Sequence, residues 1–199
     1  MENTILNPEI LRLIISSCVT LLGIVLSWYL KYKYGEYKQK KITRELSQSN
    51  LVKTILDQQL DEYKCQRSFI LQRHNGGKYG TGKSMNKLST TYESLEEGVS
   101  TEFKECQNIP MSLYTDLVNS ALNYTAIYKD VDKIDDLLTK AFFSQRGTRS
   151  AIVYPVLRGD ELMALVGFEW THSVKNIETL FDKIESDRGV IGDTLSKLL

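Results

Sequence analysis

Hydrophobic and polar positions divide the chain into an apolar N-terminal run, a polar stretch and a C-terminal region of short mixed patterns. Residues 13–30 form an 18-residue run without a charged side chain, which is long enough to cross a bilayer as a helix. Trp28, Tyr29 and Lys31 at its end are typical of a membrane interface. We therefore predict a short N-terminal segment over 1–10 and a transmembrane helix over 11–30. A cleaved signal peptide or a buried core helix fits the pattern less well.

A basic, helical stalk is predicted over residues 31–66. Residues 36–66 contain no Gly or Pro, and apolar residues recur there at helical spacing. The first half of this stretch is polar nearly all round, so a helix there either stands in solvent or self-associates. We expect a homo-oligomer formed through the stalk.

The basic residues near the apolar run are placed asymmetrically. Only Arg12 precedes the run closely, whereas six basic residues follow it, Lys31, Lys33, Lys38, Lys40, Lys41 and Arg44. Because such residues favour the cytoplasmic side, we expect a single-pass protein of the inner (cytoplasmic) membrane with its C-terminal domain in the cytoplasm.

Residues 67–199 alternate between strand and helix patterns. Strands are predicted over 67–73, 84–92 and 125–128, with a turn at His74–Gly77. Helices are predicted over 111–122, with Pro110 in the first turn, and over 134–142, ended near Gly147. The apolar runs 151–157 and 162–170 form a β-hairpin, and a terminal helix follows over 177–198. This order predicts an α/β (α+β) domain with an antiparallel sheet flanked by helices.

Charge and cysteine content narrow the function classes. The 25 acidic and 25 basic residues balance, so no overall field favours a nucleic-acid partner. Three cysteines, Cys18, Cys65 and Cys106, are an odd number without metal-type spacing, which favours free thiols in a reducing compartment. The two histidines lack nearby carboxylates at ligand spacing, so we expect no metal site.

The C-terminal pattern resembles a GAF domain, a small sensory relative of PAS domains. The resemblance covers about residues 46–199 and is carried mainly by residues 150–170, SAIVYPVLRGDELMALVGFEW. This segment is similar to the late GAF hairpin in its apolar-Pro-apolar strand, charged Gly turn and Gly-containing return strand. The resemblance implies a module that holds a small ligand, often a nucleotide or chromophore, between sheet and helices, or that only dimerises. No cysteine lies in a bilin-attachment context, and the identity of any cofactor is left open.

A second resemblance is architectural. One span followed by a Tyr/Lys-rich stalk, Tyr34–Lys40, and an α/β domain is similar to holins of T-even-type phages. It would imply an oligomeric lysis protein of the inner membrane. That family places its soluble domain in the periplasm, which is opposite to the orientation expected here.

The segment from Gly77 to Ser84 matches the phosphate-loop pattern. Gly77 and Gly82 would cradle phosphates, Lys83 would supply charge and Ser84 would bind magnesium. The motif must open a helix, whereas the residues after Ser84 form a Thr-rich strand pattern. We favour a glycine-rich hairpin loop and keep a phosphate-loop nucleotide-binding protein as an alternative.

A ligand cleft is the other site hypothesis. Arg73, His74 and Asn75 at a strand end, with Lys87 and Tyr92 from the next strand, could line it. The competing interpretation is a turn in which Asn75 bonds its own backbone. No nucleophile–base pair is evident, so we expect no enzyme. The sequence favours a membrane-anchored, non-catalytic GAF-like sensory or interaction module that self-associates and binds a small ligand.

Overall fold

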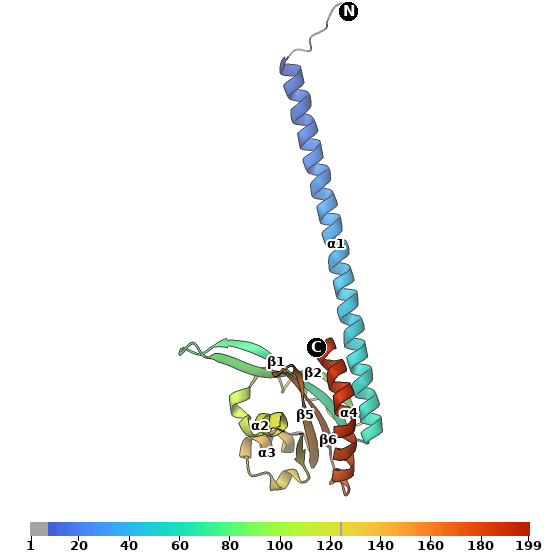
Figure 1. Cartoon of the computed structure of the whole chain (residues 1–199), viewed down its shortest axis with the longest axis vertical. Coiled ribbons are helices and arrows are strands. Elements are labelled where there is room, and N and C mark those ends of the chain that lie inside the picture. Colours follow the sequence, from blue (N-terminus) through green and yellow to red (C-terminus); the bar gives the residue numbers. More distant parts are fainter. Residues whose placement is uncertain (1–7, 124) are drawn as a thin grey trace, which may run out of the picture. The chain divides into compact units, whose positions relative to one another are not determined.

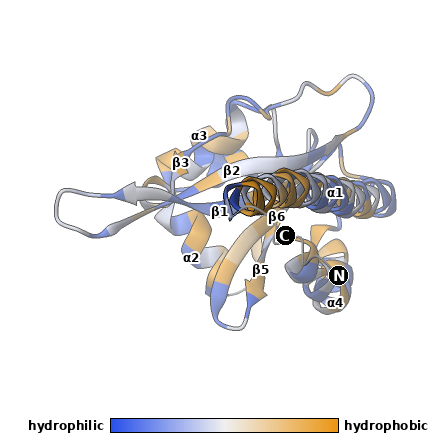
Figure 2. Cartoon of the chain, turned by 90° about the horizontal axis from the view of Figure 1, so that it is seen from above, coloured by the Kyte–Doolittle hydropathy of each residue, from blue (hydrophilic) through white to orange (hydrophobic). Residues whose placement is uncertain are grey.

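The computed structural model describes residues 8–123 and 125–199, which fall into an N-terminal unit ending at Gln48 and a compact domain from Ser49 to Leu199. A single helix, α1 (Pro8–Tyr63), runs through both units (Figure 1). The first unit contains an 18-residue window that is apolar enough to cross a membrane, and none of that window is buried. Figure 2 shows this part of α1 coloured as hydrophobic. The protein therefore has one candidate membrane-spanning helix among its described residues.

The domain contains a six-stranded antiparallel sheet with the strand order β3-β2-β1-β6-β5-β4. The long strands are β1 (Arg67–Lys78), β2 (Ser84–Leu95), β5 (Ser150–Arg158) and β6 (Glu161–Trp170), and the short edge strands are β3 (Ile109–Pro110) and β4 (Ala126–Tyr128). The helices are α2 (Thr115–Asn123), α3 (Leu137–Ser144) and α4 (Ile177–Leu198), with short 3₁₀ turns η1 (Met111–Leu113) and η2 (Val131–Lys133). These elements confirm the predicted mixed fold class.

Helices cover both faces of the sheet (Figure 1). On one face, α4 and the residues of α1 beyond Ser49 pack on alternate residues of β6 from Ala164 to Trp170. On the other face, α2 and α3 pack on Phe69, Leu71 and Leu165. Because successive strand residues point to opposite faces, the covered strands β5 and β6 are apolar at most positions, and β1 is apolar at Phe69, Ile70 and Leu71. Figure 2 shows β5 and β6 coloured mostly as hydrophobic.

The C-terminal hairpin and helix lie where the sequence predicts them. β5 and β6 pair in antiparallel register from Ser150 opposite Trp170 to Arg158 opposite Glu161. Gly159 closes the turn with a φ of +60°, a value that suits glycine. Gly147 has a φ of +70° three residues after α3 ends, in agreement with its predicted role.

The predicted turn at His74–Gly77 is wrong. β1 continues through these residues to Lys78, and the chain turns at residues 79–83. His74 lies opposite Lys87 and Asn75 opposite Asn86, with an irregularity between Asn75 and Lys78. Asn75 Oδ1 accepts a local hydrogen bond of 2.8 Å from the Gly77 N–H. The chain does not reverse there, because β1 and β2 stay paired on both sides of a local irregularity. Beyond Gln72, β1 has no pairing to β6, so residues 73–87 form a β1–β2 ribbon, which β3 joins only at Lys87.

Two helix starts also differ from prediction. Pro110 belongs to edge strand β3 and not to a helix, since an edge strand tolerates a residue without an N–H. A 3₁₀ turn follows, and α2 begins at Thr115. The next helix begins at Leu137 and not at Ile134, because the Asp136 side chain caps it by accepting the Thr139 N–H.

Candidate functional site: a cavity at the edge of the sheet

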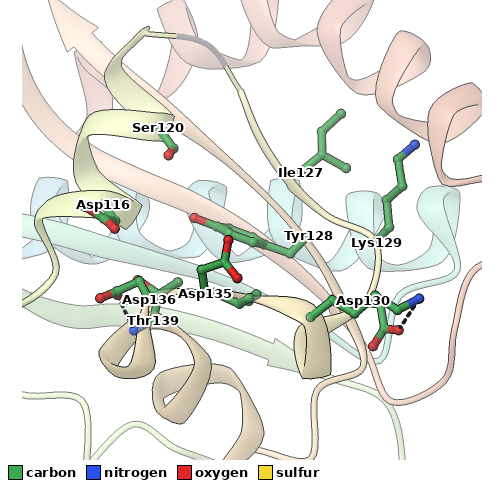
Figure 3. Close-up of a pocket in the computed structure, with 11 residues that line it drawn as sticks. Asp116, Ser120, Ile127, Tyr128, Lys129, Asp130, Asp135, Asp136 and Thr139 are labelled. Atoms are coloured by element: carbon green, nitrogen blue, oxygen red, sulfur yellow. Dashed lines mark hydrogen bonds and ion pairs between the residues drawn. The ribbon is translucent and has the colours of Figure 1, made fainter.

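A cavity of about 480 Å³ opens between edge strand β4, helix α2 and the segment from η2 to α3 (Figure 3). This volume is in the range of small-molecule sites. It is lined by residues from four elements and their connections, Asp116, Ser120, Ile127, Tyr128, Lys129, Asp130, Lys133, Ile134, Asp135, Asp136 and Thr139. A second hollow of about 520 Å³ shares Ser120, Ile127 and Tyr128 with it. The edge of the sheet and two helices thus form one hollowed surface.

The lining is acidic. It contains four aspartates and two lysines, which gives a formal charge of −2. Both lysines are engaged: Lys133 Nζ lies 3.1 Å from Asp130 Oδ2, and Lys129 pairs with Glu178 of α4. In the described part of the chain, no lysine or arginine lies within ion-pair distance of Asp116, Asp135 or Asp136. Three of the four cavity aspartates therefore lack a cationic partner: Asp116, Asp135 and Asp136, of which Asp136 instead accepts the Thr139 N–H.

Tyr128 lies at the centre of the cavity, and its hydroxyl points toward the side of α2 that carries Asp116 and Ser120 (Figure 3). Its ring packs on Phe143 with a centroid distance of 5.1 Å. Burial raises the pKa of Tyr128 to about 12 and outweighs the lowering effect of a hydrogen bond with Ser120. The phenol is therefore neutral near pH 7 and keeps both its proton and its aromatic face.

The start of α3 forms another wall of the cavity. The pKa of Asp136 lies below its usual value because the Thr139 side chain and main-chain N–H both favour the carboxylate. The buried Thr139 hydroxyl lies close enough to Asp136 to favour its carboxylate but does not meet hydrogen-bond geometry, so its oxygen keeps an unused capacity to accept a bond. Buried polar atoms of this kind are uncommon in folded proteins and call for a partner.

Thr125, the residue immediately before strand β4, links this strand to α4 on the opposite face of the sheet. Thr125 bonds to Glu185 and accepts a bond of 3.2 Å from Arg188, both in α4. Further along α4, Asp187 accepts a bond of 3.0 Å from the Tyr63 hydroxyl at the end of α1. A polar chain thus connects the strand that floors the cavity with α4 and with the last turn of α1.

The sheet face beneath α2 and α3 is filled by side chains, which leaves the cavity at the sheet edge. Phe69 lies directly opposite Gly167, and a Cβ on that glycine would come 2.1 Å from the ring. The Arg146 guanidinium stacks 4.0 Å from the Phe142 ring centroid and 5.0 Å from that of Phe69. The glycine of the return strand is thus required by a ring that occupies the space over the central strands.

A buried ionic cluster stands behind these rings. Glu169 accepts hydrogen bonds from Arg67, from Arg146 at 2.7 Å and from Thr148 at 2.9 Å. Arg67 Nε lies 3.2 Å from Glu93. Because each charge has an opposite partner, the cluster is electrically satisfied, and we assign it a structural role. No sequence pattern predicted this cluster; the available signal was Glu169, a charged residue between Phe168 and Trp170.

The structure places four of the five predicted cleft residues on the β1–β2 ribbon. Arg73 pairs with Glu161, His74 Nε2 lies 2.9 Å from Ser89 Oγ, and Lys87 packs against Gly76. Tyr92 lies elsewhere, with its hydroxyl 3.1 Å from Ser49 Oγ of α1. None of the five residues lines the sheet-edge cavity, so a ligand site on the ribbon stays a prediction.

The glycine-rich loop has the geometry of a hairpin. Gly77 and Gly82 have positive φ values of +101° and +81°, and Tyr79 and Lys83 close the turn through a main-chain bond of 2.8 Å. Ser84 begins strand β2. The helix N-terminus that a phosphate loop needs is therefore missing after Lys83, and the described loop does not support nucleotide binding.

Neither the cysteines nor the carboxylates provide an obvious cofactor site. Burial raises the pKa of Cys65 to about 12 and also raises that of Cys106, which lies 2.7 Å from Arg146. Within residues 8–123 and 125–199, no three His, Cys, Asp or Glu side chains group in a way that could hold a metal ion. The cavity is therefore a site of hydrogen-bonding, charged and aromatic groups.

Comparison with known proteins identifies the fold. No family model and no curated protein matches the chain. Among solved structures, the GAF domain region of a predicted membrane protein of Geobacter sulfurreducens PCA superimposes with a TM-score of 0.57 at 18% identity, covering 80% of this chain and 99% of that one. A phycoerythrobilin-bound GAF domain from a cyanobacterial phytochrome gives 0.60 at 13%, covering 80% and 91%. The cyanobacteriochrome receptor PixJ gives 0.57 at 15%, covering 78% and 99%. Residues 49–199 thus have a GAF-like fold.

Proposed function

We propose that the chain is a membrane-anchored, non-catalytic sensory module that binds a small molecule in the sheet-edge cavity. The observation that carries this proposal is the hollow between sheet and helices in a GAF-like domain. Solved relatives of the fold include domains that hold a bilin. In this chain no cysteine lines the described cavity, which favours a ligand held without a covalent bond.

Helix α1 supplies the output route. It contains the candidate span, and after Ser49 it also contributes Val52, Leu56 and Tyr63 to the core of the domain. The polar chain from Thr125 through α4 to Tyr63 connects the cavity strand with this helix. A ligand that shifts β4 therefore changes the hydrogen bonds of α4, including the bond between Asp187 and Tyr63 at the end of α1. The signal is the resulting change in how the stalks of neighbouring chains associate.

Binding is tested by thermal unfolding of the full chain in a non-ionic detergent, with cationic, neutral and anionic metabolites in turn. Ser120→Trp fills the cavity, and Ser186→Trp makes the same change on the exposed surface of α4. A compound that raises the melting temperature of the wild type and of Ser186→Trp, but not of Ser120→Trp, supports the proposal. Equal shifts in all three proteins, or none for any compound, would contradict it.

The membrane part is tested separately. A reporter fused after Leu199 is expected to be active only in the cytoplasm, because the basic residues follow the span. Reporter activity in the periplasm would show that the expected orientation is wrong. It would then favour the holin hypothesis, which the comparisons do not support.

A further inference from the structure

We propose that the sheet-edge cavity selects an organic ammonium ion with a short apolar body. This inference rests on the proposed small-molecule function and adds the chemical class of the ligand. Asp116 and Asp135 supply the charge, and the ring of Tyr128 supplies the contact surface.

The first argument is electrostatic. The cavity has a formal charge of −2, and its two lysines already pair with Asp130 and Glu178. A phosphate or carboxylate ligand would add a like charge among these aspartates, whereas an ammonium ion would neutralise one. The cavity thus differs from a nucleotide site, in which basic side chains or helix N-termini meet the phosphates.

The second argument is the aromatic residue between the acids. Tyr128 lies between the side of α2 that carries Asp116 and the connection that carries Asp135 (Figure 3). Cations bind favourably over aromatic faces, and carboxylates beside such a face are the usual partners of an ammonium group. Ile127 and Ile134, which also line the cavity, provide apolar surface for the remainder of a ligand.

The third argument is the unsatisfied hydroxyl in the wall. Thr139 is 1% exposed, and its oxygen has no hydrogen bond of good geometry in the described structure. A ligand ammonium has three donors to distribute among acceptors, and Thr139 is one of the residues that line the cavity. The cavity therefore combines volume, uncompensated negative charge, an aromatic wall and a free acceptor.

The test uses three probes that share one phenyl body. 2-Phenylethylamine is cationic, 2-phenylethanol is neutral and phenylacetate is anionic at pH 7. Each is titrated into the full chain in non-ionic detergent by calorimetry. The variant Asp116→Asn/Asp135→Asn removes two of the three charges without a cationic partner and keeps Asp136, which caps α3. Asp160→Asn makes the same kind of change in the exposed β5–β6 turn.

The amine is expected to bind, the anion not to bind, and the double variant to weaken amine binding at least about tenfold while Asp160→Asn leaves it unchanged. Added salt is expected to weaken amine binding. If the alcohol or the carboxylate binds as tightly as the amine or more tightly, the inference that the ligand is an ammonium ion is wrong. The proposal that the cavity binds a small molecule would not be contradicted by that result. Failure of the amine to bind at millimolar concentration, or equal binding to the double variant, would also overturn the inference. The metabolite screen decides the broader function independently.

Discussion

Replacing Gly167 by alanine tests how tightly the sheet face under α2 and α3 is filled. The new Cβ would lie 2.1 Å, 2.5 Å and 2.8 Å from three atoms of the Phe69 ring. Since carbon atoms pack at about 3.5–4.0 Å, the ring would have to move by more than about 1 Å. It has little room, because Phe69 is 1% exposed and Arg146 stacks beside it. Overpacking of this kind costs about 1–3 kcal/mol, and we expect the free energy of unfolding to fall by about 2 kcal/mol.

The assay is urea unfolding of the full chain in detergent, followed by the fluorescence of Trp170, which is 1% exposed. Trp28→Phe removes the other tryptophan. Gly189→Ala is the matched control, because it makes the same change in α4, where nothing lies within 4 Å. It is expected to stabilise by about 0.5–1 kcal/mol through the higher helix propensity of alanine.

A double-mutant cycle identifies the cause. Phe69→Leu removes the ring that the new Cβ at residue 167 would meet. The losses of unfolding free energy from Phe69→Leu and Gly167→Ala should therefore not add. We expect the double variant to be at least about 1 kcal/mol more stable than the sum of the two losses predicts. A Gly167→Ala variant as stable as wild type, or strictly additive costs, would refute the ring-over-glycine explanation.

Three further predictions follow from other parts of the domain. Glu169→Ala leaves Arg146 without its carboxylate partner and should lower the free energy of unfolding by about 3–5 kcal/mol in the same assay, whereas Asp160→Asn should have little effect. Because the pKa of Tyr128 is raised from 10.0 to about 12, its protonated phenol contributes to stability in full below pH 10, and this contribution is lost as the pH rises through 12. Tyr128→Phe should therefore lose less stability than the wild type over this pH range. Identical stability profiles of the two proteins at alkaline pH would contradict this explanation. Lys83→Ala in the hairpin loop should change stability by less than about 0.5 kcal/mol, and calorimetry should detect no magnesium-dependent ATP binding by either protein.

The elements with strong periodicity were predictable from sequence. The long N-terminal helix that contains the candidate span, the β5–β6 hairpin and the terminal helix each have a clear apolar pattern. Turn or charge signals bound these patterns. A turn was predicted at His74–Gly77 because a local Asn75–Gly77 bond and two glycines are typical of turns. The strand forms instead through the pairing of His74 with Lys87, a non-local contact that local sequence signals do not indicate. Of these two glycines, Gly77 has a positive φ, of +101°, next to the strand irregularity.

The cavity could not be predicted in the same way. Asp135 and Asp136 have the sequence pattern of a solvated surface, and only the fold brings them beside Tyr128 and Asp116. The available signal was several aspartates on both sides of a short strand that carries an aromatic residue. Arg73 and Lys83 were candidate ligand-binding residues because charged side chains near glycines are typical of binding loops. In the structure both lie on the β1–β2 ribbon, and neither lines the cavity.

The most direct test of the sensory proposal is cysteine cross-linking of the stalk in native membranes, with and without saturating 2-phenylethylamine. Gln39→Cys places a thiol in the stalk, Cys18→Ser removes the exposed native thiol, and burial keeps the pKa of Cys65 near 12, so that thiol stays protonated. We predict cross-linked dimers or higher species whose rate of formation changes at least about twofold with the amine. The change should be absent in Asp116→Asn/Asp135→Asn. Monomers only, or a rate unaffected by an amine that calorimetry shows to be bound, would contradict a sensory role.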